Sequence, residues 1–263
     1  MFTTHFKMTD HPFKEKVPID AIFRDERMIQ GSARLEFLKH HASIALITGD
    51  EGVGKSSLVR LFMASLHQKQ YRPLYTHLTR FNAASFLKII VSAMDELPAW
   101  GKQNLFFQIL NKTKSPDIAT ILLIDEAQLL AQDSLIDLRL LVSSAIEETD
   151  SLKIVLIGHS AIKKELRRSC HAALLQRITV RYHIPPLTLS QTEQYMDFHM
   201  RRVGASEKVF ETEVKSDIHE YARGVPRLIN NLATACLIDA AVLNSQKVTH
   251  AILLQTLDDF QIF

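Results

Sequence analysis

The sequence predicts an α/β fold, a five-stranded parallel sheet covered by helices, followed by a small all-helical domain. Two observations predict it. Short apolar runs alternate with longer segments of helical spacing up to about residue 187, and only helical patterns follow. Such alternation favours parallel strands joined by right-handed connections. Because 263 residues exceed what one compact core usually needs, we expect a larger domain over 1–187, which includes a short N-terminal segment, and a smaller one over 188–263.

Five short runs are expected to form the strands of the sheet. The first, third and fourth are almost wholly apolar, as expected for strands that are covered on both faces. Segments with helical spacing lie between the strands, for example Ser56–Gln68 and Asn82–Leu97. The predicted strands are Ile44–Thr48, Leu74–Leu78, Ile121–Asp125, Ile154–Gly158 and Ile178–Ile184.

The helical domain is predicted from residues that begin and end helices. Ser190 and Glu193 have the spacing of a capping box. Gly224 is a stop signal, and Pro226 stands where the first turn of a helix tolerates proline. The expected helices cover 190–204, 211–223, 226–244 and a last segment that Thr249 caps.

Composition excludes several classes of protein. The chain is 46% hydrophobic and 23% charged, which is typical of a globular protein and not of a disordered or fibrous one. A net charge of +2 is too small to indicate nucleic-acid binding by itself. Cys170 and Cys236 lack metal-type or redox-type spacing, so we expect reduced, buried thiols. No run is long enough to span a membrane and the N-terminus lacks a signal core, which predicts a cytoplasmic protein.

The strongest motif is a phosphate-binding loop. The segment Gly49–Ser56 fits the pattern G-x-x-x-x-G-K-[ST] between a predicted strand and a predicted helix. Glycines let the backbone curl so that its N–H groups converge on phosphate oxygens, and the helix N-terminus adds its positive end. Lys55 is expected to reach the β- and γ-phosphates and Ser56 to ligate Mg²⁺; the alternative is a fortuitous glycine-rich turn. The expected ATP-binding residues are Gly49, Asp50, Glu51, Gly52, Val53, Gly54, Lys55, Ser56 and Ser57.

An acidic pair follows the third predicted strand. Asp125 is expected to hold Mg²⁺, and Glu126 to orient and deprotonate the attacking water. Ligands of open α/β sheets sit outside the carboxyl ends of the strands, which is the edge where both the loop and this pair fall. The alternative is a solvated pair at the end of a strand. A P-loop kinase would transfer the phosphoryl group to a small molecule. A glutamate directly after the aspartate favours hydrolysis over such a transfer.

With these motifs, nearly the whole chain resembles the AAA+ ATPases. It is similar in particular to the general secretion pathway A (ExeA) branch, which includes transposition helper ATPases of the Mu B, TnsC and TniB type. The resemblance also rests on Phe6–Phe13, on Leu156–His159, on Leu175–Leu187 and on the G-x-P-R-x-I-N segment Gly224–Asn230. It implies a P-loop AAA+ core with a helical lid.

The resemblance assigns roles to three further residues. Arg227 is expected to contact the γ-phosphate bound to its own subunit; the alternative is a surface arginine near a helix cap. His159 stands at the sensor-1 position, where the family has a polar amide, so buried packing is the alternative. Arg177 is the first candidate for an arginine finger that reaches a neighbouring subunit, which implies a homo-oligomer, either a ring or a filament. Its competitors are Arg167, Arg168 and Arg181.

The resemblance offers two tasks for the ATPase. In the transposition branch such a core binds duplex DNA as an ATP-dependent oligomer and regulates a partner transposase. In the secretion branch it is the ATPase core of a general secretion (ExeA-type) assembly protein, followed by a membrane span that this chain lacks. The length favours the first task, although a fragment of a longer protein would look the same. A nucleotide switch that does not hydrolyse is disfavoured by the intact Lys55, Asp125 and Glu126.

Binding of DNA requires basic residues that face a duplex. The densest basic segment is 161–168, with Lys163, Lys164, Arg167 and Arg168, and Lys102, Lys112 and Lys114 form a looser group. Such residues are expected to contact phosphates with salt-dependent affinity and little sequence preference. The alternative is a solvated helix face.

Overall fold

The computed structural model describes residues 2–77, 81–115, 117–148 and 151–260. Within it the chain divides into two compact units, each described by itself below. The α/β unit consists of Glu26–Asp50 and Lys55–Ile184, and the helical unit consists of Met1–Asp25, Glu51–Gly54 and Pro185–Phe263.

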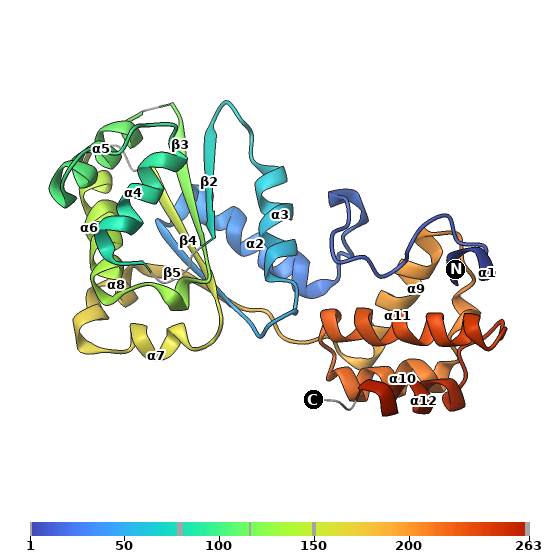
Figure 1. The fold of residues 1–263 in the computed structure, drawn as a ribbon. Helices are drawn as coiled ribbons and strands as arrows, with labels where there is room; N and C mark the ends of the chain where they lie inside the picture. The colour runs from blue at the N-terminus through green and yellow to red at the C-terminus, as the bar shows by residue number, and fades with distance from the viewer. Residues whose placement is uncertain (1, 78–80, 116, 149–150, 261–263) are drawn as a thin grey trace. The chain divides into compact units, whose positions relative to one another are not determined.

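The α/β unit is built on a five-stranded sheet, which confirms the predicted fold class. All four strand pairs are parallel, in the order β2-β3-β4-β1-β5 (Figure 1). β2 begins at Tyr71, earlier than the predicted start at Leu74, and the predicted end at Leu78 lies outside the described residues. The strands are β1 (Ile44–Thr48), β2 (Tyr71–His77), β3 (Ala119–Asp125), β4 (Leu152–Gly158) and β5 (Ile178–His183).

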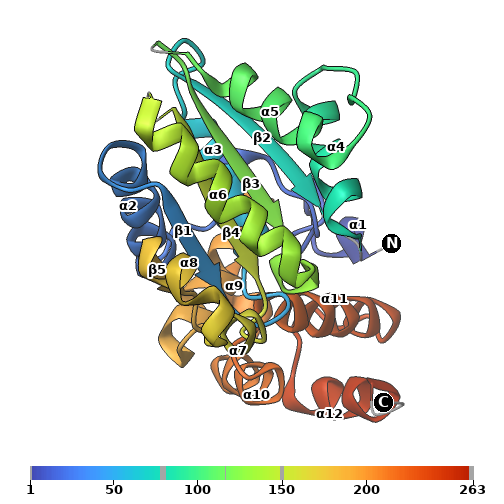
Figure 2. The same cartoon turned by 90° about the vertical axis from the view of Figure 1, so that its left-hand side faces the viewer.

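Helices cover both faces of this sheet (Figures 1 and 2). α2 (Glu26–His41) and α3 (Lys55–Ser65) lie on one face. α4 ends before the predicted Leu97, because Asp95 adopts a left-handed conformation with φ 59°. The opposite face carries α4 (Ala83–Ala93), α5 (Lys102–Thr113), α6 (Gln132–Glu148) and α8 (Ala172–Arg177), and the short α7 (Ile162–Leu166) precedes α8.

The helical unit contains the four helices that were expected after the sheet. The predicted capping box was wrong in its position: α9 begins at Leu189, so Ser190 is already helical. The box is formed by Thr188 and Gln191, whose side chains each accept a hydrogen bond from the other's backbone N–H. The helices are α9 (Leu189–Arg202), α10 (Thr212–Ala222), α11 (Pro226–Val242) and α12 (His250–Phe260), with the short α1 (Phe2–His5) at the N-terminus.

The N-terminal segment packs in the helical unit, whereas we expected it with the α/β domain. Phe6, Met8 and Phe13 are buried in the apolar core formed by α9–α12. Phe13 meets Phe210 edge-on at a centroid distance of 6.1 Å, and the Arg202 guanidinium donates to the carbonyl of residue 12 at 2.9 Å. Local spacing could not show this, because the partners lie far along the chain. The boundary near residue 187 stays a prediction.

Two expectations from composition have different outcomes. Cys236 is buried as expected, but Cys170 is exposed, because it lies in a short 3-10 turn (Ser169–His171) at the surface. Among the described residues, no helix combines the length and the apolar character that a membrane crossing requires.

Candidate functional site

The phosphate-binding loop lies where the sequence predicts it, between β1 and α3. Gly52 and Gly54 have φ values of 77° and 110°, a region that side chains with a Cβ rarely adopt. The backbone N–H of Gly49 donates to the carbonyl of Gly158 at 3.3 Å, which ties the start of the loop to the end of β4. The loop therefore has the glycine-dependent curl that a phosphate nest needs.

Lys55 is the first residue of α3, and its amine bends back over the loop. Nζ donates to the carbonyl oxygens of Gly49 at 2.9 Å and Asp50 at 2.8 Å. Ser56 and Ser57 follow in the first helical turn, where backbone N–H groups have no partner inside the helix. A cation and a helix N-terminus thus meet at one place, which suits a phosphate group.

Asp125 is held by hydrogen bonds at the buried end of β3. Its Oδ1 accepts from the backbone N–H of Glu126 at 2.9 Å, and its Oδ2 accepts from the Tyr75 hydroxyl at 2.6 Å. Burial, followed by this hydrogen bond, raises the pKa of Tyr75, so the phenol stays a donor. Tyr75 is not among the residues predicted from the sequence. Its signal is weak, since only the strand pairing places β2 beside β3, with Tyr75 opposite Leu123.

Glu126 leaves the strand in a left-handed conformation, with φ 56° and ψ 36°. Its Oε2 accepts a hydrogen bond from Nε2 of Gln128 at 2.6 Å. Gln128 lies in the 3-10 turn η2 (Ala127–Leu129), and no motif pointed to it.

His159 follows β4 at the same edge of the sheet. Its side chain is 44% exposed, with Nε2 at 3.5 Å from Oδ1 of Asp50 in the phosphate loop. The alternative of buried packing is therefore wrong, and the imidazole lies beside Asp50 of the phosphate loop.

The residues present fit a magnesium ion. Mg²⁺ prefers oxygen ligands and is usually held by one or two protein groups together with substrate phosphates. The Ser56 hydroxyl and the Asp125 carboxylate are such groups, and the described residues contain no cluster of three or more His, Cys, Asp or Glu side chains that could form a separate metal cage. Bound there, the ion would neutralise charge on the phosphates.

Arg227 lies in the first turn of α11, within the helical unit. In this unit its backbone N–H donates to the carbonyl of Gly52 at 3.3 Å. The chain enters α11 through Gly224, whose φ is 67° and whose Cβ, if present, would lie 2.1 Å from the carbonyl oxygen of Leu187. Glycine is therefore required at position 224, where the G-x-P-R turn begins. The hydrogen bond to Gly52 places Arg227 next to a residue of the phosphate loop.

The structure separates the four candidates for an arginine finger. Arg181 donates to the carbonyls of Leu175 at 2.6 Å and Ile178 at 3.0 Å, which ties it to its own unit. Arg168 pairs with Glu165 at 2.8 Å. Arg177 is exposed at the end of α8, and Arg167 is exposed just after α7.

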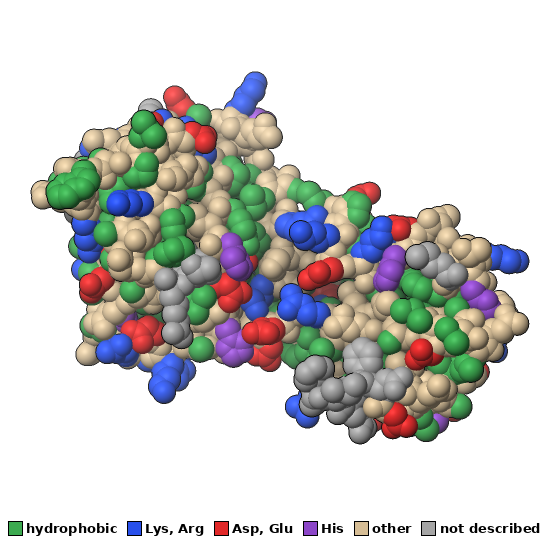
Figure 3. All heavy atoms as spheres, in the orientation of Figure 1, with side chains coloured by type: hydrophobic (Ala, Val, Ile, Leu, Met, Phe, Trp, Pro, Cys, Tyr) green, Lys and Arg blue, Asp and Glu red, His purple; other side chains and the backbone are tan. Residues whose placement is uncertain are grey.

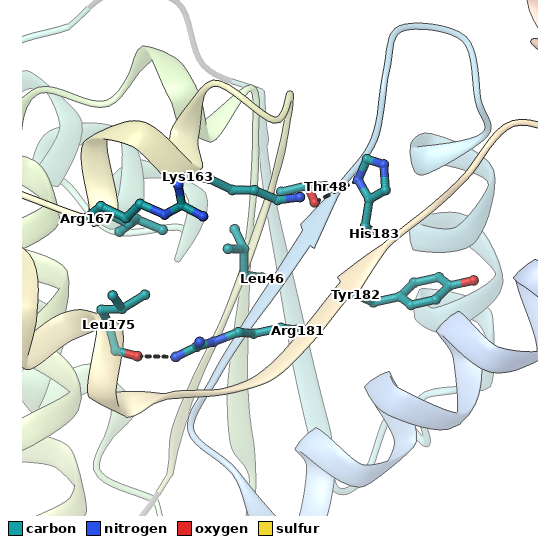
Figure 4. Close-up of a pocket in the computed structure, with 9 residues that line it drawn as sticks. Leu46, Thr48, Lys163, Arg167, Leu175, Arg181, Tyr182 and His183 are labelled. Atoms are coloured by element: carbon teal, nitrogen blue, oxygen red, sulfur yellow. Dashed lines mark hydrogen bonds between the residues drawn. The ribbon is translucent and has the colours of Figure 1, made fainter.

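Part of the predicted basic segment borders a cavity instead of forming an open helix face (Figure 4). The cavity has a volume of about 440 Å³ and lies between α7, α8 and β5. Figure 4 shows Lys163 reaching toward Thr48 and His183, while Tyr182 points to the other side of β5. Burial, followed by the charge of Lys163, lowers the pKa of His183. None of the described residues that line the cavity is acidic. They are Leu46, Thr48, Lys163, Leu166, Arg167, Leu175, Arg181, Tyr182 and His183.

The second predicted basic group does not act as one patch. Lys102 pairs with Asp137 at 2.9 Å, and Lys112 pairs with Glu96. Basic and acidic side chains are also interspersed on the face drawn in Figure 3. The cavity rim is therefore the stronger candidate for binding an anionic partner.

Comparison with known proteins agrees with this geometry. Residues 38–166 match the family model described as AAA domain, a range that contains the phosphate loop, the acidic pair and His159. The chain therefore contains an AAA domain with the P-loop AAA+ fold, and it is an ATPase. It is 29% identical over 262 residues to general secretion pathway protein A of Aeromonas hydrophila. That alignment covers 95% of this ATPase and 47% of the relative, so the chain spans about half the length of the curated relative it matches.

Solved structures show the same fold at low sequence identity. Cdc6p from Pyrobaculum aerophilum has a TM-score of 0.76 and 15% identity, covering 96% of the ATPase and 71% of that chain. The Aeropyrum pernix ORC1 protein in complex with DNA has a TM-score of 0.68 and 16% identity, covering 95% and 67%. The Thermotoga maritima RuvB Holliday junction branch migration motor has a TM-score of 0.64 and 16% identity, covering 96% and 74%.

Proposed function

We propose that this AAA+ ATPase assembles on duplex DNA as an ATP-dependent homo-oligomer and regulates a partner transposase. The observation that carries the DNA-binding part is the cavity rim, which Lys163, Arg167 and Arg181 border with no acidic side chain among the described lining residues. The transposase rests on the resemblance of the chain to transposition helper ATPases.

The hydrolysis site works through this chain's own residues and ATP. Lys55 holds the β- and γ-phosphates, and Ser56 and Asp125 hold Mg²⁺. Glu126 orients the attacking water and accepts its proton. His159 and Arg227 contact the γ-phosphate end of the nucleotide, where Arg227 suits the planar arrangement of phosphate oxygens.

Full activity requires a neighbouring subunit. Arg177 is exposed at the end of α8, where a guanidinium is available to another copy of the chain. An arginine finger supplied in this way raises turnover by about 10³- to 10⁵-fold. A single subunit is therefore a slow enzyme, and oligomerisation on DNA switches hydrolysis on.

Phosphates of DNA suit the cavity rim because three basic side chains border it, those of Lys163, Arg167 and Arg181. Arg181 is oriented by two backbone carbonyls, so its guanidinium is already ordered before a ligand arrives. Phosphate contacts of this kind give salt-dependent binding with little sequence preference. The similar Aeropyrum pernix ORC1 structure is itself a complex with DNA.

A second candidate is the ATPase core of a general secretion assembly. The 29% identity to general secretion pathway protein A, over 95% of this chain, favours it. In that role hydrolysis drives a protein assembly, and DNA has no effect on it.

ATP hydrolysis at low salt, measured with and without duplex DNA over a range of protein concentrations, separates the two candidates. We expect DNA to stimulate turnover cooperatively as protein concentration rises. Turnover that is indifferent to DNA would reject the DNA-loading function and favour the secretion-type core.

A matched pair of double variants tests the rim. Lys163→Ala with Arg167→Ala should weaken DNA binding and make the negative slope of log affinity against log salt shallower by about 2. Lys208→Ala with Lys247→Ala removes the same charge from exposed positions of the helical unit and should leave the slope unchanged. Equal slopes in both variants would place the DNA elsewhere on the molecule.

A further inference from the structure

Gln128 connects two parts of the site that the sequence motifs treat as separate. Its Nε2 donates to Oε2 of Glu126 at 2.6 Å, and its Oε1 accepts from the backbone N–H of His159 at 2.9 Å. One side-chain amide therefore joins the acidic residue after β3 to the residue that follows β4.

The orientation of this amide is fixed by its two partners. The backbone N–H of His159 can only donate, so it must meet the amide oxygen of Gln128. The ionised carboxylate of Glu126 can only accept, so it must meet the amide nitrogen. A flipped amide would place a donor against a donor and an acceptor against an acceptor, and both bonds would be lost.

Gly158 makes room for the amide. A Cβ at this position would lie 2.4 Å from Oε1 of Gln128 and 3.2 Å from the backbone nitrogen of Ala127. Gly158 is not among the glycines with positive φ, which are Gly52, Gly54, Gly101, Gly204 and Gly224. Close approach of Gln128, and not backbone conformation, is therefore the reason for glycine at the end of β4.

Glu126 needs such support because its backbone is in an uncommon conformation. A non-glycine residue in the left-handed region costs on the order of 1 kcal/mol and persists only where its surroundings hold it. Its N–H is bonded to Asp125, and its carboxylate is bonded to Gln128. The first contact fixes the backbone and the second fixes the direction of the side chain.

We propose that Gln128 is a positioning residue for hydrolysis. It holds Oε2 of Glu126, so that Oε1 is the oxygen that takes the proton of the attacking water. Its bond to the backbone N–H of His159 also fixes the position of the carboxylate relative to the end of β4. That end of β4 is bonded to Gly49, the first residue of the phosphate loop. The inference rests on the proposed role of Glu126.

The decisive experiment is steady-state ATP hydrolysis together with a direct measurement of ATP affinity for the full chain. Gln128→Ala should lower kcat by about 10- to 100-fold, as expected for loss of a hydrogen bond to a charged group, and leave ATP affinity within about twofold. Gln128→Glu keeps the size and the acceptor for His159 but removes the donor, and it should lose at least as much. Gln132→Ala, an exposed glutamine at the start of α6, is the matched control and should match the wild type.

Gly158→Ala probes the same contact from the other side. The added methyl group should displace the amide and lower kcat as Gln128→Ala does. Gln128→Ala already lacks the side-chain amide that the methyl group would displace. The double variant Gln128→Ala with Gly158→Ala should therefore have a kcat no lower than that of Gln128→Ala alone. Additive losses would mean that Gly158 acts independently of Gln128.

Glu126→Gln separates failure of the inference from failure of the proposed function. If this variant keeps the wild-type kcat, the base is wrongly assigned. If it abolishes turnover while Gln128→Ala or Gln128→Glu hydrolyses ATP as fast as the wild type or faster, only the positioning role is overturned. A parallel loss of ATP affinity and thermal stability in Gln128→Ala would likewise overturn it, because that pattern indicates a purely structural residue.

Discussion

The two compact units bury their cores in similar ways but treat polar groups differently. In the α/β unit, Lys55, Asp125 and Glu126 gather at the carboxyl edge of the sheet, where each has hydrogen-bond partners. In the helical unit, His199 lies 3% exposed among Phe13, Tyr195 and Phe198. Parallel strands that end side by side create an edge for charged groups, whereas packed helices offer apolar surfaces between them.

This difference teaches where substitutions should act. Changes at the edge of the sheet should alter turnover and leave unfolding almost unchanged. Changes in the core of the helical unit should alter the free energy of unfolding and leave the chemistry intact. Five substitutions, from the largest expected effect to the smallest, test that division.

Lys55→Ala should have the largest effect, because it removes ATP binding, turnover and DNA loading together, whereas Glu126→Gln removes turnover alone. Loss of a charged donor to two phosphates weakens ATP binding by about 10²- to 10³-fold, so turnover and DNA loading should both disappear. Lys69→Ala, an exposed lysine of the same unit, is the control. ATP affinity and DNA binding measured side by side check the result, and unaltered DNA binding would disconnect loading from the nucleotide.

Glu126→Gln should remove turnover without removing binding. Loss of a general base lowers kcat by about 10²- to 10⁴-fold, while the phosphate loop still holds ATP. The variant should therefore accumulate on DNA in an ATP-loaded state. Sedimentation of the complex with DNA measures this, and rapid release from DNA would contradict it.

Phe13→Ala should act on stability alone. Truncation of a buried phenylalanine costs about 3–5 kcal/mol. Hydrogen exchange should show the lost protection in α9–α12, since Phe13 packs in the core of that unit. Phe107→Ala, whose side chain is half exposed on α5, should be nearly neutral. If Phe13→Ala instead reduced protection in the sheet, the N-terminal segment would have to pack against the α/β unit.

His199 should make the helical unit sensitive to acid. Burial, followed by the charge of Arg202, lowers the pKa of His199 to about 4. Between the unfolded pKa of about 6.5 and the folded value, the unfolded state binds more protons, so stability falls as pH falls through this range, by up to about 3 kcal/mol. Urea unfolding gives the free energy of unfolding at about pH 7 and pH 4, and the difference between the two values should be smaller in His199→Gln than in the wild type. An equal pH dependence in both proteins would assign the effect to other groups.

Tyr75→Phe should have the smallest effect on the edge. The phenol orients Asp125 from β2, and loss of such a supporting hydrogen bond should raise the Mg²⁺ concentration for half-maximal turnover by about tenfold. Titration of ATP hydrolysis with Mg²⁺ measures it at saturating ATP. Unchanged stability is expected because the ring remains, and an unchanged Mg²⁺ requirement would make the contact incidental.

Several features could be predicted because they depend on consecutive residues. The phosphate-loop pattern is eight residues long, and its last two residues begin α3. Gly52 and Gly54 have the positive φ angles that the pattern implies. The strand before Asp125 is apolar from Ile121 to Ile124, so its end is easily located. Helix ends were less certain, because Thr188 and Ser190 are both good caps and only packing decides between them.

Other features depend on strands and helices that are distant in sequence. Tyr75, Gln128 and Gly158 come from three different segments, and no short pattern links them. The basic residues Lys163 and Arg167 could be noted from the sequence, but the cavity that they line together with Arg181 could not.

By itself, the sequence determined the order of strands and helices, the helical region after residue 187 and the residues of the phosphate loop and acidic pair. These follow from local periodicity and from the spacing of glycine, lysine and carboxylate. Only the tertiary structure decided that the N-terminal segment packs on the lid helices and that Gln128 joins Glu126 to His159. Burial of apolar side chains and pairing of buried polar atoms are satisfied by partners anywhere along the chain, so these contacts exist only once the strands and helices have packed.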